Sequence, residues 1–363
     1  MKKIKSVYIH IPFCNSICSY CDFCKVVYNH DWIKPYFEKL ESEVDNSYMG
    51  EEIETLYIGG GTPSCLSLEE LKKLFQIIDK FHKSKTIEFT FECNLNDIEE
   101  EKFQFLYNQG VNRLSIGIES FDEEKLEFMK RESNWKEAKK KIKQLRRIGF
   151  KNINVDLMYA IPKETIKVLK KDLKKFVKLK PEHISTYSLI IEKNTLVGLN
   201  KIKPIEEEHD FKMYHTIGKK LKKKGYIHYE ISNFAKKGYE SHHNLTYWNN
   251  DEYYGFGVGA SGFVEAIRYE NTKSLTEYLK GNFISSKSLM SKVDNMENEL
   301  ILGFRKLEGI NLEKFFEKYE ENMQNIFPIK PLIKNGDLIY KNGRVYINPK
   351  KLYVMNEILL KLI

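Results

Sequence analysis

The feature that most constrains the fold of this chain is a regular alternation of short apolar runs with longer amphipathic stretches over its first two thirds. Six strand-like runs occur, each followed by a stretch of helical periodicity. The expected strands are Val7–Phe13, Thr55–Gly59, Ile87–Cys93, Arg113–Glu119, Ile153–Met158 and His183–Ile190, and the helices begin near Trp32, Leu68, Ile98, Asn134, Glu164 and Glu206. Repeated βα units predict an α/β fold with a parallel sheet, closed as a barrel or open and doubly wound. Functional groups then gather at the carboxyl ends of the strands.

The last third of the chain has a different character. The stretch Tyr239–Phe263 is rich in Tyr, Asn, His and Gly, has little helical or strand period, and is expected to be a functional loop. Helical periodicity returns at Met296, and the runs Leu338–Tyr340 and Val345–Ile347 flank a turn. Helices followed by a hairpin predict a small winged-helix-like domain. The expected division is a core, 1–235, a connecting region, 236–290, and a C-terminal domain, 291–363.

Composition excludes several classes of protein. The 363 residues are 42% hydrophobic, enough for a substantial core, but no apolar run approaches the roughly 20 residues that span a bilayer. The start of the chain has no secretory signal pattern, so the expected location is the cytoplasm. The net charge of +8 comes largely from lysine-rich helical faces. No nucleic-acid-binding module accompanies these lysines, while a peripheral attraction to anionic membrane surfaces stays open.

Four of the 6 cysteines lie close together in a loop directly after the first expected strand. Cys14, Cys18 and Cys21 have CxxxCxxC spacing. In a reducing compartment such crowding indicates metal binding rather than disulfide bridges. Thiolates are the usual ligands of iron–sulfur clusters, and a [4Fe-4S] cluster normally takes four of them. Three thiolates leave one iron with an open position, where the amino and carboxylate groups of a small molecule could bind.

Cys24 adds a fourth thiol, so a closed cluster and a zinc site are alternatives. Structural zinc sites usually draw two ligand pairs from separated turns, whereas these four cysteines follow one another within a single short segment. The favoured hypothesis is a cluster on the three CxxxCxxC cysteines, with Cys24 as a nearby thiol that does not bind iron. Cys65 and Cys93 stand alone and are expected to be buried.

The segment from Tyr8 to Cys24 resembles the cluster motif of the radical S-adenosylmethionine (SAM) superfamily, in particular the oxygen-independent coproporphyrinogen oxidase-like branch that includes HemW-type heme chaperones. The resemblance implies a partial, TIM-like (β/α)6 barrel with a small C-terminal helical domain, a [4Fe-4S] cluster and bound SAM. After the second strand, Gly60, Gly61 and Thr62 match the family motif that contacts the methionine part of SAM. Adjacent glycines let a backbone approach a ligand that side chains would block.

Further polar residues stand at or near the ends of the later strands. Glu92 and Glu119 end the third and fourth strands, Arg131 follows, and Asp156 lies near the end of the fifth. These positions resemble SAM contacts of the family, as does Tyr8, although the family usually has glutamine in place of Glu119. Each carboxylate alone could cap a helix or pair with a lysine. Together, polar groups at successive strand ends converge on one face, as a bound nucleotide requires.

A second motif distinguishes branches of the family. His243, Asn244, Tyr247 and Trp248 form the pattern HNxxYW, which resembles the signature that HemW-type chaperones associate with heme binding. An imidazole could bind heme iron while the aromatic rings cover the macrocycle. A histidine beside aromatic rings is more often a hydrogen-bonded packing residue, and the adjacent His242 is an alternative ligand.

The resemblance implies a heme chaperone that delivers heme to acceptor hemoproteins, such as respiratory ones, with a flavodoxin or ferredoxin as reductant. The alternative within the branch is a coproporphyrinogen III oxidase, and a zinc-stabilised binding module is a third reading. Oxidases of the branch carry a long segment before the cluster motif and a cysteine two positions after its third cysteine. Here Phe23 occupies that position, and few residues precede Cys14.

Overall fold

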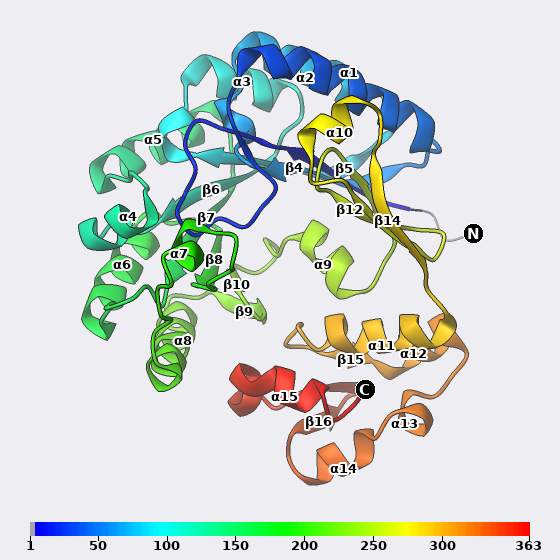
Figure 1. Ribbon diagram of the computed structural model, residues 1–363. Helices are drawn as coiled ribbons and strands as arrows, with labels where there is room; N and C mark the ends of the chain where they lie inside the picture. Colours follow the sequence, from blue (N-terminus) through cyan, green and yellow to red (C-terminus); the bar gives the residue numbers. More distant parts are fainter. Residues whose placement is uncertain (1–3) are drawn as a thin grey trace.

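The computed structural model describes residues 4–363, with strands through the centre of the larger part and helices along its outer side (Figure 1). The strands are β1 Ser6–Ile11, β2 Phe13–Cys14, β3 Val26–Val27, β4 Ile53–Gly60, β5 Lys83–Asn94, β6 Arg113–Glu119, β7 Asn152–Tyr159, β8 His183–Ser188, β9 Ile227–Glu230, β10 Asn233–Ala235, β11 Tyr254–Phe256, β12 Ser261–Val264, β13 Ile267–Asn271, β14 Ile284–Leu289, β15 Ile310–Asn311, β16 Leu338–Lys341 and β17 Arg344–Ile347.

The helices are α1 His30–Ser47, α2 Leu68–Ile78, α3 Glu100–Asn108, α4 Glu123–Met129, α5 Trp135–Ile148, α6 Ile166–Lys178, α7 Leu196–Leu199, α8 Glu207–Lys222, α9 His242–Trp248, α10 Leu275–Leu279, α11 Lys292–Gly303, α12 Leu312–Tyr319, α13 Met323–Ile326, α14 Ile329–Lys334 and α15 Met355–Leu359. None of the helices within residues 4–363 combines the length and the apolar character needed to cross a membrane.

Nine strands form the main sheet in the order β11-β1-β4-β5-β6-β7-β8-β10-β9. Every pairing from β11 to β8 is parallel, and β10 and β9 continue the sheet in antiparallel fashion. The six expected βα units are all present, with α1, α2, α3, α5, α6 and α8 as the connecting helices. The predicted α/β class with a partial, TIM-like barrel is therefore confirmed.

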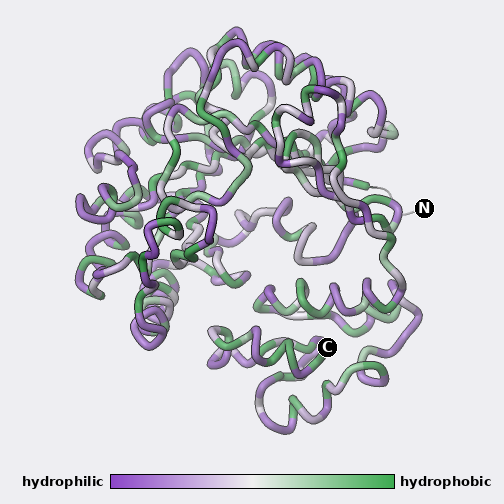
Figure 2. Tube along the Cα trace, viewed as in Figure 1, coloured by the Kyte–Doolittle hydropathy of each residue, from purple (hydrophilic) through white to green (hydrophobic). Residues whose placement is uncertain are grey.

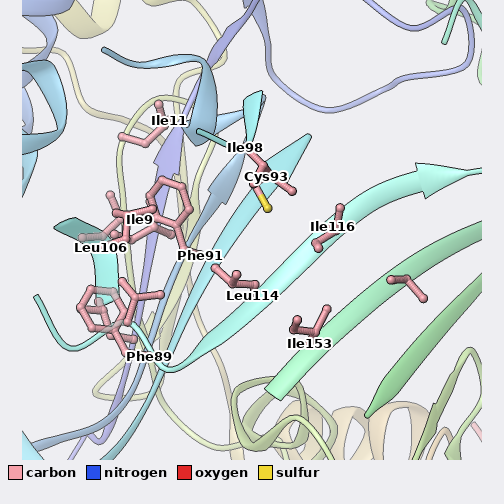
Figure 3. Packing of buried hydrophobic residues seen from close by; sticks show 14 of the residues in the cluster. Ile9, Ile11, Phe89, Phe91, Cys93, Ile98, Leu106, Leu114, Ile116 and Ile153 are labelled. Carbon is pink, nitrogen blue, oxygen red and sulfur yellow. The ribbon is translucent and has the colours of Figure 1, made fainter. Parts of the chain in front are cut away.

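The core lies between the sheet and its helices. Alternate residues of the strands, such as Ile9, Phe91 and Leu114, point together toward the helical layer and are almost fully buried (Figure 3). The helices alternate between hydrophilic and hydrophobic positions along their length (Figure 2), and α6, for example, buries Leu169 and Phe176. Because parallel strands are covered on this side, their outward residues are continuously apolar, which leaves the polar inward residues to form a site.

The expected loop at residues 239–263 is wrong in part, because this segment contains the helix α9 and the strands β11 and β12. The side chain of Ser241 accepts a hydrogen bond from the Asn244 backbone amide and caps α9. Tyr254 of β11 pairs with Val7 of β1 and extends the main sheet. A helix of seven residues and strands of three or four residues are too short to display a periodicity, and only the contact with β1 makes β11 a strand.

The C-terminal helices and hairpin enclose a separate apolar cluster. Its members come from α11, α12, the β16–β17 hairpin and α15, and they include Leu300, Phe315 and Val345, all at most 1% exposed. The helices followed by a hairpin agree with the expected winged-helix-like order. This cluster begins at Met296, whereas Tyr254 and Tyr278 of the connecting region belong to the main core.

A buried carboxyl lies where the sheet meets the C-terminal part. Glu230 of β9 is 0% exposed and bridges to Lys306 through the backbone. Burial raises the pKa of Glu230 to about 7. Because the pKa of Glu230 is higher in the folded than in the unfolded protein, the folded state holds this proton more tightly. The resulting contribution to the stability of the folded protein is present below pH 4 and is lost as the pH rises through 7. We expect Glu230→Gln to be more stable than wild type at pH 8 by about 3 kcal/mol and similar at pH 4.

Urea unfolding of both proteins at several pH values measures this difference. Glu208→Gln, at an exposed position of α8, is the matched control and should show no comparable pH dependence. A constant difference between wild type and Glu230→Gln across this pH range would contradict the expectation.

Candidate functional site

A cavity of about 420 Å³ opens at the carboxyl ends of the parallel strands. Ten of the predicted site residues line it, namely Cys14, Cys18, Cys21, Gly60, Gly61, Thr62, Glu92, Glu119, Arg131 and Asp156. Its volume lies in the range typical of sites for small ligands. The loop after β1 therefore brings the thiols to the same hollow as the polar ends of β4, β5, β6 and β7.

The three motif cysteines all line this cavity. Cys14 ends β2, and its Sγ is 3.5 Å from the hydroxyl of Thr62. The Sγ of Cys18 accepts a hydrogen bond of 3.6 Å from Nη1 of Arg131. Burial raises the pKa of Cys14 to about 11 and also raises that of Cys21, so ligation of a metal must displace protons from these thiols.

Within residues 4–363, no group of three or more His, Cys, Asp or Glu side chains is arranged to hold a single metal ion. In a four-iron cluster each thiolate binds a different iron atom. Three cysteines that line one cavity fit such a cluster, because their thiols need not converge on a single point.

Glu92 also lines the cavity and is held in place by two hydrogen bonds. The Tyr57 hydroxyl donates to Oε1 at 2.6 Å, and the Gly60 amide donates to Oε2 at 3.0 Å. Burial raises the pKa of Glu92 to about 7, opposed by the hydrogen bond from Tyr57. A buried carboxyl with a fixed orientation can accept hydrogen bonds from ligand hydroxyls at a defined place.

Arg131 joins the thiol side of the cavity to the carboxylate side. Its Nη2 donates to the Gly117 carbonyl at 2.6 Å and lies 3.5 Å from Oε1 of Glu119. Burial raises the pKa of Glu119 to about 7, opposed by Arg131. The positive φ of 66° at Glu119 turns the chain sharply at the end of β6, a strained conformation for a residue other than glycine.

Asp156 and the glycines complete the cavity. Asn154 donates to Oδ1 of Asp156 at 2.7 Å, and burial raises the pKa of Asp156. A Cβ at Gly61 would lie 2.7 Å from the Pro12 carbonyl carbon, and one at Gly117 would lie 2.7 Å from Nη2 of Arg131. The backbone is thus packed as closely at these two positions as glycine permits.

Several lining residues were not predicted from the sequence. Ser115 lines the cavity two residues before Gly117 on β6, and the strand period of two measured back from Glu119 would have found it. Met158, Tyr187 and Ile190 also line the cavity. Met158 lies two residues after Asp156 on β7, so the same period would have found it, whereas Ile190 follows the end of β8 and no strand period identifies it.

Of the residues predicted to bind SAM or the cluster, Tyr8 lies outside the cavity lining, and so does the neighbouring thiol of Cys24. The Tyr8 hydroxyl is 3.0 Å from Nδ1 of His10, so its role in SAM binding stays a prediction. Cys24 points away from the motif thiols, with its Sγ donating to the Lys273 carbonyl at 3.4 Å and lying against Gly259. This direction agrees with the expectation that Cys24 is not a cluster ligand.

The HNxxYW residues lie on α9, which does not line the cavity. His243 is 1% exposed, with Nδ1 2.8 Å from the Thr55 hydroxyl and Nε2 2.7 Å from the Tyr247 hydroxyl. Asn244, Tyr247 and Trp248 are half-buried, whereas His242 is exposed. Arg305 lies over the Trp248 ring at 5.4 Å from its centroid. Of the two histidines, His242 is thus the one open to a ligand.

Comparisons with known proteins agree with this geometry. The Radical SAM superfamily model matches residues 8–176, and the HemN C-terminal domain model matches residues 290–353. The solved structure of coproporphyrinogen III oxidase (HemN) from Escherichia coli superposes with a TM-score of 0.85, at 21% sequence identity, over 99% of this chain and 90% of that chain. This likeness establishes the fold.

Curated relatives extend over nearly the whole chain. The heme chaperone HemW of Lactococcus lactis is 37% identical over 99% of this chain and 97% of its own length. That of Bacillus subtilis is 37% identical over 98% of both chains, and that of Escherichia coli is 34% identical over 84% of this chain and 83% of its own length. Together with the thiol-lined cavity at the end of a partial (β/α)6 barrel, these similarities mean that the chain belongs to the HemW family of the radical SAM superfamily.

Proposed function

We propose that this protein is a heme chaperone that binds heme, a [4Fe-4S] cluster and SAM and delivers heme to acceptor hemoproteins. The observation that carries the proposal is the joining of three thiols and four polar strand ends in one cavity, in a chain that is 37% identical over 99% of its length to a heme chaperone. In this proposal the cofactors carry out the difficult chemistry, and the protein binds and orients them.

In this proposal the cluster is held by Cys14, Cys18 and Cys21, which leave one iron open. The guanidinium of Arg131 donates to the sulfur of Cys18 at 3.6 Å and fixes the position of this side chain at the cavity. When bound to these three cysteines and reduced, the cluster would supply the electron needed to cleave the sulfonium of SAM. The polar residues that line the cavity would orient SAM.

SAM would occupy the rest of the cavity, between the thiols and the carboxyl groups. Gly60, Gly61 and Thr62 present backbone to its methionine part. Glu92 is oriented to accept hydrogen bonds from ribose hydroxyls, and the Glu119–Arg131 pair and Asp156 supply the remaining polar wall. Tyr8 belongs to the predicted set, although its hydroxyl contacts His10.

Heme binding is proposed through the HNxxYW region, on the strength of the relatives and of the motif. Trp248 and Tyr247 supply aromatic surface and His242 an exposed imidazole. His243 stays a candidate ligand, but its binding to iron requires that Nε2 give up its hydrogen bond with Tyr247. The proposed heme acceptors are hemoproteins such as respiratory ones, and the proposed reductant is a flavodoxin or ferredoxin. The free thiols fit a reducing compartment such as the cytoplasm.

Titration of heme into anaerobically prepared protein tests the proposal. We expect a saturable change in the heme absorption spectrum with one heme per chain and a weaker response from His242→Ala. Lys273→Ala, a change remote from the motif, is the control. A spectrum unaffected by the protein would contradict heme binding.

The oxidase alternative makes a different prediction. Incubation with coproporphyrinogen III, SAM and a reductant should yield no protoporphyrinogen IX, as measured by chromatography of the oxidised porphyrins. Substantial product that depends on Cys18 would overturn the chaperone assignment in favour of the oxidase.

A further inference from the structure

The hydrogen bonds around His243 form one directional chain. The Thr55 hydroxyl donates to Ser6 Oγ at 2.8 Å, so the Thr55 oxygen accepts from Nδ1 of His243 at 2.8 Å. Nε2 is then the acceptor for the Tyr247 hydroxyl at 2.7 Å. This arrangement requires a neutral imidazole, and burial lowers the pKa of His243 to about 3. Both ring nitrogens are therefore fixed, between α9 on one side and β4 on the other.

The helix that carries His243 is itself attached to the sheet. The backbone amides of His242 and His243 donate to the carboxylate of Glu88 at 3.0 and 2.9 Å, and the Ser241 hydroxyl donates to the same carboxylate at 3.3 Å. A carboxylate at the start of a helix also interacts favourably with the helix dipole. The first turn of α9 is thus anchored on the middle of β5, the strand that carries Glu92 near its carboxyl end.

One side chain separates His243 from the cavity. Tyr57 follows Thr55 on the same face of β4, and its ring lies against the imidazole of His243 with centroids 5.1 Å apart and an angle of 31° between planes. The Tyr57 hydroxyl donates to Oε1 of Glu92 at 2.6 Å. The contacts therefore form a series from α9 to the cavity, in which His243 packs against Tyr57 and Tyr57 is hydrogen-bonded to Glu92.

We propose that His243 is a positioning residue for the nucleotide site, because its ring fixes Tyr57 and the Tyr57 hydroxyl fixes Glu92. This inference rests on the proposed binding of SAM beside Glu92. It assigns to the histidine of HNxxYW a role that needs no contact with iron. Without the imidazole, the Tyr57 ring has space to tilt, and a hydrogen bond weakens steeply as its geometry departs from linear.

The test is the affinity of cluster-loaded, anaerobic protein for SAM, measured by calorimetry without heme. His243→Ala and Tyr57→Phe should each weaken SAM binding about tenfold, the size of one hydrogen bond to a charged group. The double variant should lose little more than either single variant, since both interrupt the same series of contacts. His215→Ala, which removes an exposed imidazole on α8, should bind SAM as wild type does.

Thermal unfolding separates positioning from a general loss of structure. If His243→Ala has a lower melting temperature but binds SAM with wild-type affinity, the inference is overturned. Additive losses of SAM affinity in the double variant would also overturn it. The variant Glu92→Ala separates the proposed SAM site from the proposed coupling between His243 and that site. If Glu92→Ala binds SAM normally, both the assignment of the nucleotide site and its coupling to His243 fail. If Glu92→Ala binds SAM weakly while His243→Ala binds it normally, only the coupling fails.

Discussion

Replacing Cys14, Cys18 or Cys21 by serine is expected to abolish the iron–sulfur cluster, whereas Cys24→Ser keeps it. The three motif thiols line the cavity, while Cys24 points toward the Lys273 carbonyl and Gly259. A serine hydroxyl ionises far less readily than a thiol at neutral pH and is therefore a poor replacement for a thiolate ligand. Iron and sulfide content and the visible spectrum of anaerobically purified protein measure the loss, which should approach four iron atoms per chain in each motif variant.

Cys24→Ser is a matched control, because it makes the same chemical change only three residues from Cys21. Full cluster content in Cys24→Ser together with loss in Cys18→Ser would establish the ligand set. Loss of the cluster from Cys24→Ser, or zinc without sulfide in the wild-type protein, would contradict it.

The second large effect concerns stability. Lys125 of α4 is buried, and its ammonium donates to Oε1 of Glu164 at 2.7 Å, to Oδ2 of Asp172 at 3.2 Å and to the Met158 carbonyl at 2.8 Å. Asp172 also accepts from the Phe121 amide at 3.0 Å. This network connects the loop after β6 to α6 and to the end of β7, where Met158 lines the cavity.

We expect Lys125→Met to destabilise the protein by about 3–5 kcal/mol, because it leaves two buried carboxyl groups without their cation. Denaturant unfolding measures the difference. Lys72→Met on α2 is the control, since Lys72 and Glu69 form an exposed pair at 2.7 Å and such pairs contribute at most about 1 kcal/mol.

The pH dependence of this variant gives a further check. Burial raises the pKa of Glu164, so protonation at mildly acidic pH should restore part of the stability that Lys125→Met loses. An unfolding free energy within about 1 kcal/mol of wild type at neutral pH would contradict the network's proposed contribution.

The six βα units could be predicted from the sequence because each depends on neighbours along the chain. The period of two in a strand and the period of about 3.6 in a helix are visible in a single segment. β6 was predicted with its exact bounds, Arg113–Glu119. By contrast, β11 consists of three residues and exists because it pairs with β1, so no local pattern identified it.

The candidate site divides in the same way. The cysteine spacing and the polar strand ends are features of the sequence, and parallel strands bring their carboxyl ends to one edge whatever the details of packing. The sequence therefore determined which strands contribute to the cavity, as seen for Glu92, Glu119 and Asp156.

Only the tertiary structure decided the direction and the environment of individual side chains. Arg131 reaches Cys18 across 113 positions of the chain, and His243 reaches Thr55 across 188. Cys24 is turned away from the motif thiols, and His243 is buried while His242 is exposed. The physical reason is that burial, desolvation and hydrogen-bond partners are set by residues distant in sequence, so identical residue types side by side can acquire opposite roles.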